Sequence, residues 1–230
     1  MGSVAQIKGN DAASGGTSIA TTTLASNVTS GNFLQLVVSG DVPATITPTK
    51  NSGTATIGTW TQRETQTEAG TGSFSTWLTC AITGTGTIDV LGTYGSSQTN
   101  VRAISIAEIA GVSGFQGSSS QQDGGNNPTT TVTVNVTTAP AFGVMQGVDD
   151  QGGTLTVGAG WTSDGSTGAA GLKCTVQHKA ISITGNTTGN YVNAGFDRGQ
   201  AAMLVWTDGV PPLPQGIGLR SQTFLSMGLR

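Results

Sequence analysis

Charge is scarce in this 230-residue chain: 9% of the residues are Asp, Glu, Lys or Arg, and there are one histidine and two cysteines. So few titratable side chains leave little material for proton transfer or for metal coordination. The nine Lys and Arg are scattered, and the formal net charge is -3, so the chain lacks the basic patch that DNA and RNA require. We therefore expect no enzymatic activity, no cofactor and no nucleic-acid partner.

Long hydrophobic runs are also missing. No apolar run approaches the roughly 20 residues of a membrane helix, and residues 1–5 lack the basic and apolar regions of a signal peptide. These absences predict a protein made in the cytoplasm with no membrane partner. Cys80 and Cys174 each lie on the apolar face of a predicted strand, which is compatible with two buried free thiols and with one cross-sheet disulfide.

What the chain does contain is glycine, at 36 positions, and short runs in which apolar and polar residues alternate. In residues 131–137 the valines occupy one face and Thr or Asn the other. Residues 74–82 repeat the pattern, with Phe74, Thr76, Leu78, Cys80 and Ile82 on one face. A period of two indicates half-buried strands. About a dozen such runs predict an all-β fold, a two-sheet antiparallel β-sandwich of the jelly-roll or concanavalin-like type.

The organisation along the chain follows from its turn residues. Residues 1–210 are predicted to form one sandwich domain, in which residues 118–128 are a long surface loop because they are rich in Ser, Gln, Gly and Asn. A Pro-rich spacer at 211–214 ends the domain. The remaining residues are too apolar for a free terminus, so 211–230 are predicted to be an extended C-terminal interaction arm that contacts a neighbour through Ile217, Leu219, Phe224, Leu225, Met227 and Leu229.

Few residues are candidates for chemistry. Glu108 lies in an apolar run and is interpreted as a buried, hydrogen-bonded strand residue, because the sequence places no second carboxylate beside it. His178 shares a strand face with Cys174, but two ligands without a third do not make a metal site, so a satisfied core histidine is expected. Asp149, Asp150 and Asp164 are interpreted as solvated loop carboxylates rather than Ca²⁺ ligands. We therefore predict no catalytic, cofactor-binding or metal-binding residue.

The four tryptophans leave two interpretations open. Trp77 and Trp206 lie inside predicted strands and are expected in the core. Trp60 and Trp161 lie at strand ends beside Gly or Thr, so they are the residues we single out as candidate glycan contacts, since aromatic rings stack on sugars.

The order of several motifs resembles a β-sandwich that recurs in bacteriophage virion structural proteins and in related bacterial surface proteins. The motifs are residues 33–38, 59–61, 74–78, 86–90, 104–112 and 158–161, and residues of about 30 to 206 follow the order. Proteins of this type are jelly-roll or lectin-like sandwiches that serve as capsid decorations, fibres or other tail components.

The resemblance implies a non-enzymatic virion structural protein, made in the host cytoplasm, that acts through contacts with major capsid or tail proteins and forms homo-oligomers. The alternative is a carbohydrate-binding or host-receptor-binding module, for which Trp60 and Trp161 would supply the contacts. The first function predicts self-association and attachment to particles. The second predicts saturable, Trp-dependent binding of a glycan.

Overall fold

A computed structural model describes residues 1–68, 72–122, 129–149, 155–168, 172–193 and 199–209 of the chain. These residues form seventeen strands, and they contain no helix long and apolar enough to cross a membrane. The predicted interaction arm at 211–230 lies outside the described residues.

The strands, in chain order, are β1 (Ser3–Ala12), β2 (Gly16–Ala20), β3 (Phe33–Gly40), β4 (Ile46–Ser52), β5 (Thr56–Ile57), β6 (Thr61–Thr67), β7 (Phe74–Gly84), β8 (Asp89–Gln98), β9 (Arg102–Ala110), β10 (Val112–Gln122), β11 (Thr129–Val136), β12 (Ala141–Asp149), β13 (Leu155–Val157), β14 (Thr162–Thr167), β15 (Lys173–Ile181), β16 (Gly185–Asn193) and β17 (Gly199–Asp208). Every pairing between them is antiparallel.

The strands build the same sandwich twice. In the N-terminal half, residues 3–110, one sheet has the order β1-β9-β3-β7, with β6 and the short β5 on β7, and a second sheet has the order β2-β8-β4. In the C-terminal half, residues 112–208, the orders are β10-β17-β12-β15-β14 and β11-β16-β13. Apart from β5, each strand of the first half has a counterpart at the same place in the second. Eight antiparallel strands in two sheets, with crossovers between them, form a jelly roll.

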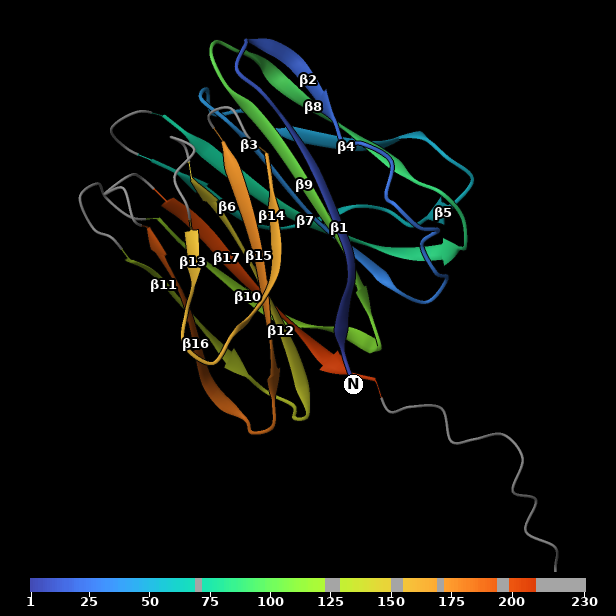
Figure 1. Ribbon diagram of the computed structural model, residues 1–230, viewed down its shortest axis with the longest axis vertical. Coiled ribbons are helices and arrows are strands. Elements are labelled where there is room, and N and C mark those ends of the chain that lie inside the picture. Colours follow the sequence, from blue (N-terminus) through green and yellow to red (C-terminus); the bar gives the residue numbers. More distant parts are fainter. Residues whose placement is uncertain (69–71, 123–128, 150–154, 169–171, 194–198, 210–230) are drawn as a thin grey trace, which may run out of the picture.

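The predicted all-β antiparallel sandwich is therefore confirmed, and the structure adds that there are four sheets in two sandwiches. The three-stranded sheets β2-β8-β4 and β11-β16-β13 lie on the outside, and the two larger sheets lie between them (Figure 1). The internal repeat was missed in the sequence because strands 46–52, 162–167 and 185–193 are polar or rich in Gly. They carry little of the alternation that marks the other strands.

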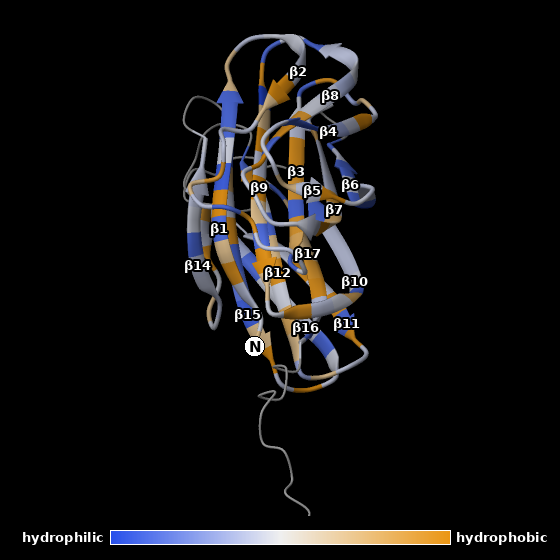
Figure 2. Ribbon diagram, turned by 90° about the vertical axis from the view of Figure 1, so that its right-hand side faces the viewer, coloured by the Kyte–Doolittle hydropathy of each residue, from blue (hydrophilic) through white to orange (hydrophobic). Residues whose placement is uncertain are grey.

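Three hydrophobic clusters fill the spaces between the layers. One lies inside the N-terminal half and contains Leu34, Leu36 and Ile106, and another lies inside the C-terminal half and contains Met145 and Tyr191. The third, which we call the central cluster, joins the two large sheets and contains both Trp77 and Trp206. Hydrophobic residues accordingly run along β9, β3 and β17 (Figure 2). Strands buried on both faces need apolar or small residues at nearly every position.

The two halves contact each other reciprocally. Strand β6 of the N-terminal half lies against β10, and their counterparts β14 and β1 also lie together. Such an exchange of equivalent partners is what a twofold relation produces. At the first of these contacts, both carboxylate oxygens of Glu64 accept hydrogen bonds, from the hydroxyls of Ser118 at 2.6 Å and Ser120 at 2.8 Å. Arg63 stacks over the ring of Phe115, 3.9 Å from its centroid.

This contact also explains one wrong prediction. Residues 118–122 were expected to belong to a surface loop, but they form the end of β10 and pair with β17. This segment has no alternation of apolar and polar residues. The strand is held instead by backbone pairing with β17 and by the hydrogen bonds of its serines to Glu64 of the other half. Residues 123–128 of the expected loop lie outside the described residues.

Both ends of the described chain meet at one end of the molecule, where the two halves are joined (Figure 1). The terminal amine of Met1 lies 3.4 Å from the carboxylate of Asp208, which also accepts a hydrogen bond from the backbone N–H of Gly2. The backbone N–H of Gly209 donates to the carbonyl of Gly111 at 2.8 Å. Gly111 has φ +69°, and a Cβ there would lie 2.5 Å from the carbonyl oxygen of Met1, so glycine is required at this junction.

Candidate functional sites

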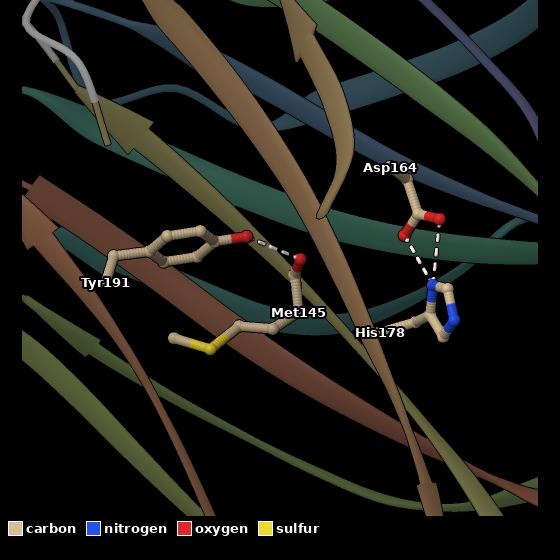
Figure 3. Close-up of polar contacts among 4 residues, drawn as sticks. All are labelled: Met145, Asp164, His178 and Tyr191. Atoms are coloured by element: carbon tan, nitrogen blue, oxygen red, sulfur yellow. Dashed lines mark hydrogen bonds and ion pairs between the residues drawn. The ribbon is translucent and has the colours of Figure 1, made fainter. Parts of the chain in front are cut away.

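His178 and Asp164 are joined by a close polar contact between their side chains, which is an ion pair when the imidazole is protonated. Nδ1 of His178 lies 2.8 Å and 2.9 Å from the two carboxylate oxygens of Asp164 (Figure 3). The two residues lie on neighbouring strands, because β14 pairs with β15. The register of this pairing shifts at a bulge between Ser163 and Gly165, next to Asp164. Burial raises the pKa of Asp164, and the hydrogen bond and charge of His178 oppose that rise.

Of the two residues, His178 lines an open surface groove of about 420 Å³, together with Phe142, Thr162 and Lys179. A carboxylate that holds one ring nitrogen orients the other, as in catalytic triads. In the described part of the chain, however, no hydrogen bond joins a serine, threonine or cysteine to the free ring nitrogen. The expected core histidine is therefore satisfied, but it lies at a groove, with 25% of its side chain exposed.

Cys174 does not join His178 in a site. Four residues along a strand separate two side chains by about 13 Å, and Cys174 is buried in the central cluster. Cys80 is buried in the N-terminal cluster, so a layer of sheet separates the two sulfur atoms. Both cysteines are free, which settles the choice that the sequence left open. Burial raises the pKa of each thiol to about 12, so neither is a reactive nucleophile.

Glu108 is a structural residue, as its sequence context predicted. It is 2% exposed and accepts hydrogen bonds from the side-chain amides of Gln6 and Asn32, both at 2.7 Å. A third comes from the backbone N–H of Thr29 at 2.8 Å. These donors tie β1 and the loop before β3 to β9. A carboxylate whose lone pairs are used in this way links segments of the fold.

A second polar network lies inside the C-terminal half. The hydroxyl of Tyr191 donates to the carbonyl oxygen of Met145 at 2.7 Å (Figure 3), and the carbonyl of Thr175 is equally near. The amide of Gln177 donates to the carbonyl of Asn190 at 3.0 Å. Burial raises the pKa of Tyr191 well above its ordinary value. The network joins the two sheets of this half.

The described residues hold no cluster of three or more His, Cys, Asp or Glu side chains with the geometry of a metal site. The interpretation of Asp149 and Asp164 as solvated loop carboxylates is wrong. Asp149 ends β12 and is fully buried, and Asp164 lies in β14, where His178 contacts it. Asp150 lies outside the described residues.

The tryptophans divide differently from the sequence interpretation. Trp77 and Trp206 are fully buried in the central cluster, as predicted. Trp161 is 7% exposed and packs in the C-terminal cluster, so the glycan contact predicted for it is wrong, because a sugar needs an exposed ring face on which to stack. Trp60 is partly exposed and lines a groove between β4 and β6.

In comparisons with known proteins, no protein-family description, no curated protein and no solved structure matches this chain.

Proposed function

We propose that this protein is a non-enzymatic structural component of a bacteriophage particle, a capsid decoration or a tail or fibre component, that acts through protein–protein contacts. The resemblance described above supplies the class of particle. The observation that carries the assembly role is the composition of the two outermost sheet faces.

The outward rows of these faces that are described next carry no charged side chain, although Lys50 is exposed at the end of β4. In the β2-β8-β4 sheet, the outward rows pair Ser18 with Thr93 and Thr47, and Ala20 with Leu91 and Thr49. In the β11-β16-β13 sheet, they pair residues 131, 133 and 135 of β11 with residues 190, 188 and 186 of β16, and all six are Thr or Asn. Depletion of Lys, Glu and Asp distinguishes the cores of protein interfaces from the rest of a surface.

Rows of small, uncharged polar residues suit contacts between repeated subunits. Their hydroxyls and amides form hydrogen bonds in either direction, and no ion must be desolvated when the face is covered. A face of this kind occurs on each side of the molecule, so a subunit of this shape can contact two neighbours at once. In the virion, the partners would be major capsid or tail proteins or further copies of this chain.

The experiment is co-sedimentation with particles and sedimentation velocity of the purified protein, using Thr133→Lys in one outer sheet and Thr93→Lys in the other. Each lysine sits on an exposed position, so the fold is retained, but a covered face would have to bury its charge. We expect at least one variant to lose association. Ser30→Lys, in an exposed loop, is the matched control. If the unmodified protein neither self-associates nor binds particles, the assembly proposal is refuted.

A further inference from the structure

Trp60 and Trp161 each stand directly before equivalent strands of the two halves, β6 and β14. Trp60 follows β5 and precedes β6, and Trp161 follows β13 and precedes β14. The local sequences match: residues 56–61 read Thr-Ile-Gly-Thr-Trp-Thr, and residues 156–162 read Thr-Val-Gly-Ala-Gly-Trp-Thr. The repeat provides an internal comparison of one side chain in two environments.

In the C-terminal half this tryptophan closes the core. The indole N–H of Trp161 donates to the carbonyl oxygen of Thr188 at 3.2 Å. Two glycines make room for the ring, since a Cβ on Gly189 would lie 2.8 Å from it and one on Gly143 would lie 3.2 Å from it. Trp161 therefore has a packing role that accounts for its size and for its polar atom.

In the N-terminal half the same side chain faces an open groove of about 430 Å³. The indole N–H of Trp60 is buried and has no hydrogen-bond partner in the described structure. The groove arises from strand pairing: β4 pairs with β8 in the outer sheet, while β6 pairs with β7 in the inner sheet. The edges β4 and β6 are therefore not hydrogen-bonded to each other, and the space between them stays open.

The lining of this groove has a definite chemistry. The apolar part is formed by the Trp60 ring, Pro48 and the side chains of Ile46 and Leu78, and the polar part by Thr47, Thr59 and Gln62. None of the described residues that line it is charged. Its volume lies within the range of about 300–1,000 Å³ that is usual for small-ligand sites.

We propose that the groove beside Trp60 binds a neutral saccharide. A pyranose ring has an apolar C–H face and a rim of hydroxyls. The indole and Pro48 offer a surface for the apolar face, and the Gln62 amide and the threonine hydroxyls offer donors and acceptors for the rim. Since the groove supplies no cation, it lacks a partner for the carboxylate or phosphate of an acidic sugar. The proposal is independent of the assembly role.

Fluorescence isolates Trp60 in the intact protein. The other three tryptophans are buried, at 0%, 0% and 7% exposure for Trp77, Trp206 and Trp161, so acrylamide quenching of the native protein should report chiefly Trp60. The quenching constant is measured with and without neutral oligosaccharides built from glucose, galactose, mannose and N-acetylglucosamine. Sialylated and uronic-acid oligosaccharides are the acidic comparison. Trp60→Phe should remove the quenchable component and so assign it.

We expect at least one neutral oligosaccharide to protect Trp60 in a saturable manner. Gln62→Ala removes an exposed amide without touching the core, and it should weaken that binding about tenfold, the value expected for one lost hydrogen bond to a ligand. Thr133→Ala, in the opposite outer sheet, is the control and should leave the affinity unchanged. The proposal is overturned if no neutral saccharide protects Trp60 or if acidic saccharides bind as tightly as neutral ones. It is also overturned if Gln62→Ala binds the saccharide as tightly as the unmodified protein does.

Discussion

Two glutamines at the centre of the interface between the halves provide the sharpest test of how the halves are held together. Gln35 of β3 and Gln146 of β12 are both fully buried, and the amide nitrogen of Gln35 donates to the amide oxygen of Gln146 at 3.2 Å. The other polar atom of each amide, Oε1 of Gln35 and Nε2 of Gln146, has no hydrogen-bond partner among the residues that the structure describes. Replacing both residues by leucine should therefore stabilise the protein.

The magnitude follows from counting the polar atoms. A buried polar atom without a partner costs about 1–3 kcal/mol, whereas a hydrogen bond contributes about 0.5–1.5 kcal/mol net. Gln35→Leu/Gln146→Leu removes two unpaired atoms, worth about 2–6 kcal/mol together, and one bond, so the free energy of unfolding should rise by about 0.5–5.5 kcal/mol. Gln146→Leu alone exchanges one unpaired atom for another and loses the bond, so it should lower that free energy by about 1 kcal/mol.

The assay is urea unfolding followed by the fluorescence of Trp77 and Trp206, which lie in the same central cluster. The double variant and both single variants form a double-mutant cycle. In thermal unfolding, each kcal/mol should shift the midpoint by about 2–4 °C for a chain of this size. A double variant that is less stable than the unmodified protein would refute the reasoning, because it would mean that the two amide atoms are satisfied by ordered water.

Three further predictions concern the core, the arm and the thiols. Val134 is 5% exposed, so Val134→Asp should prevent folding because it buries a charge. Thr133→Asp, on the open face of β11, should leave the circular dichroism spectrum unchanged. Equal damage from both variants would show that a partner covers the outer face. Deletion of residues 215–230, which carry the apolar side chains of the predicted arm, should leave the sandwich spectrum intact and lower the oligomeric state or particle attachment, and a truncated protein that assembles normally would contradict the arm. Burial raises the pKa of Cys80 and Cys174 from 9.0 to about 12. The stability that each buried thiol contributes is therefore fully present below pH 9.0, the pKa of the thiol in the unfolded chain. Above that pH, the free energy of unfolding should fall by about 1.4 kcal/mol per pH unit for each thiol. Urea unfolding at neutral pH and at about pH 10 should show this loss, and replacing both cysteines by alanine should reduce it.

The sequence alone determined the fold class and many of the strands. Alternation placed Val132, Val134 and Val136 on the inner face of β11, and all three are buried. It also placed Leu78, Cys80 and Ile82 on one face of β7, where all three join the N-terminal cluster. Such assignments succeed because the period of a strand is fixed by backbone geometry and one face must leave water.

Strands that lack alternation were decided by their neighbours. Strand β10 is rich in Ser and Gly, and it forms because β17 offers its edge and Glu64 offers a carboxylate across the seam. The His178–Asp164 pair was missed for a related reason. The two residues are 14 apart in sequence, and they are brought together by the pairing of β14 with β15. Strand β14 has no apolar face, so the sequence did not predict it.

The two tryptophans at strand ends separate the contributions of sequence and tertiary structure most clearly. Trp60 and Trp161 have nearly the same local sequence and received the same interpretation. Tertiary structure buried one beneath β16 and left the other facing a groove, because β4 and β6 belong to different sheets while Gly143 and Gly189 make room for the second ring. Local sequence determines that a strand begins beside each tryptophan; exposure depends on which side chains distant in the chain pack against the ring, and packing is settled only when the sheets are assembled.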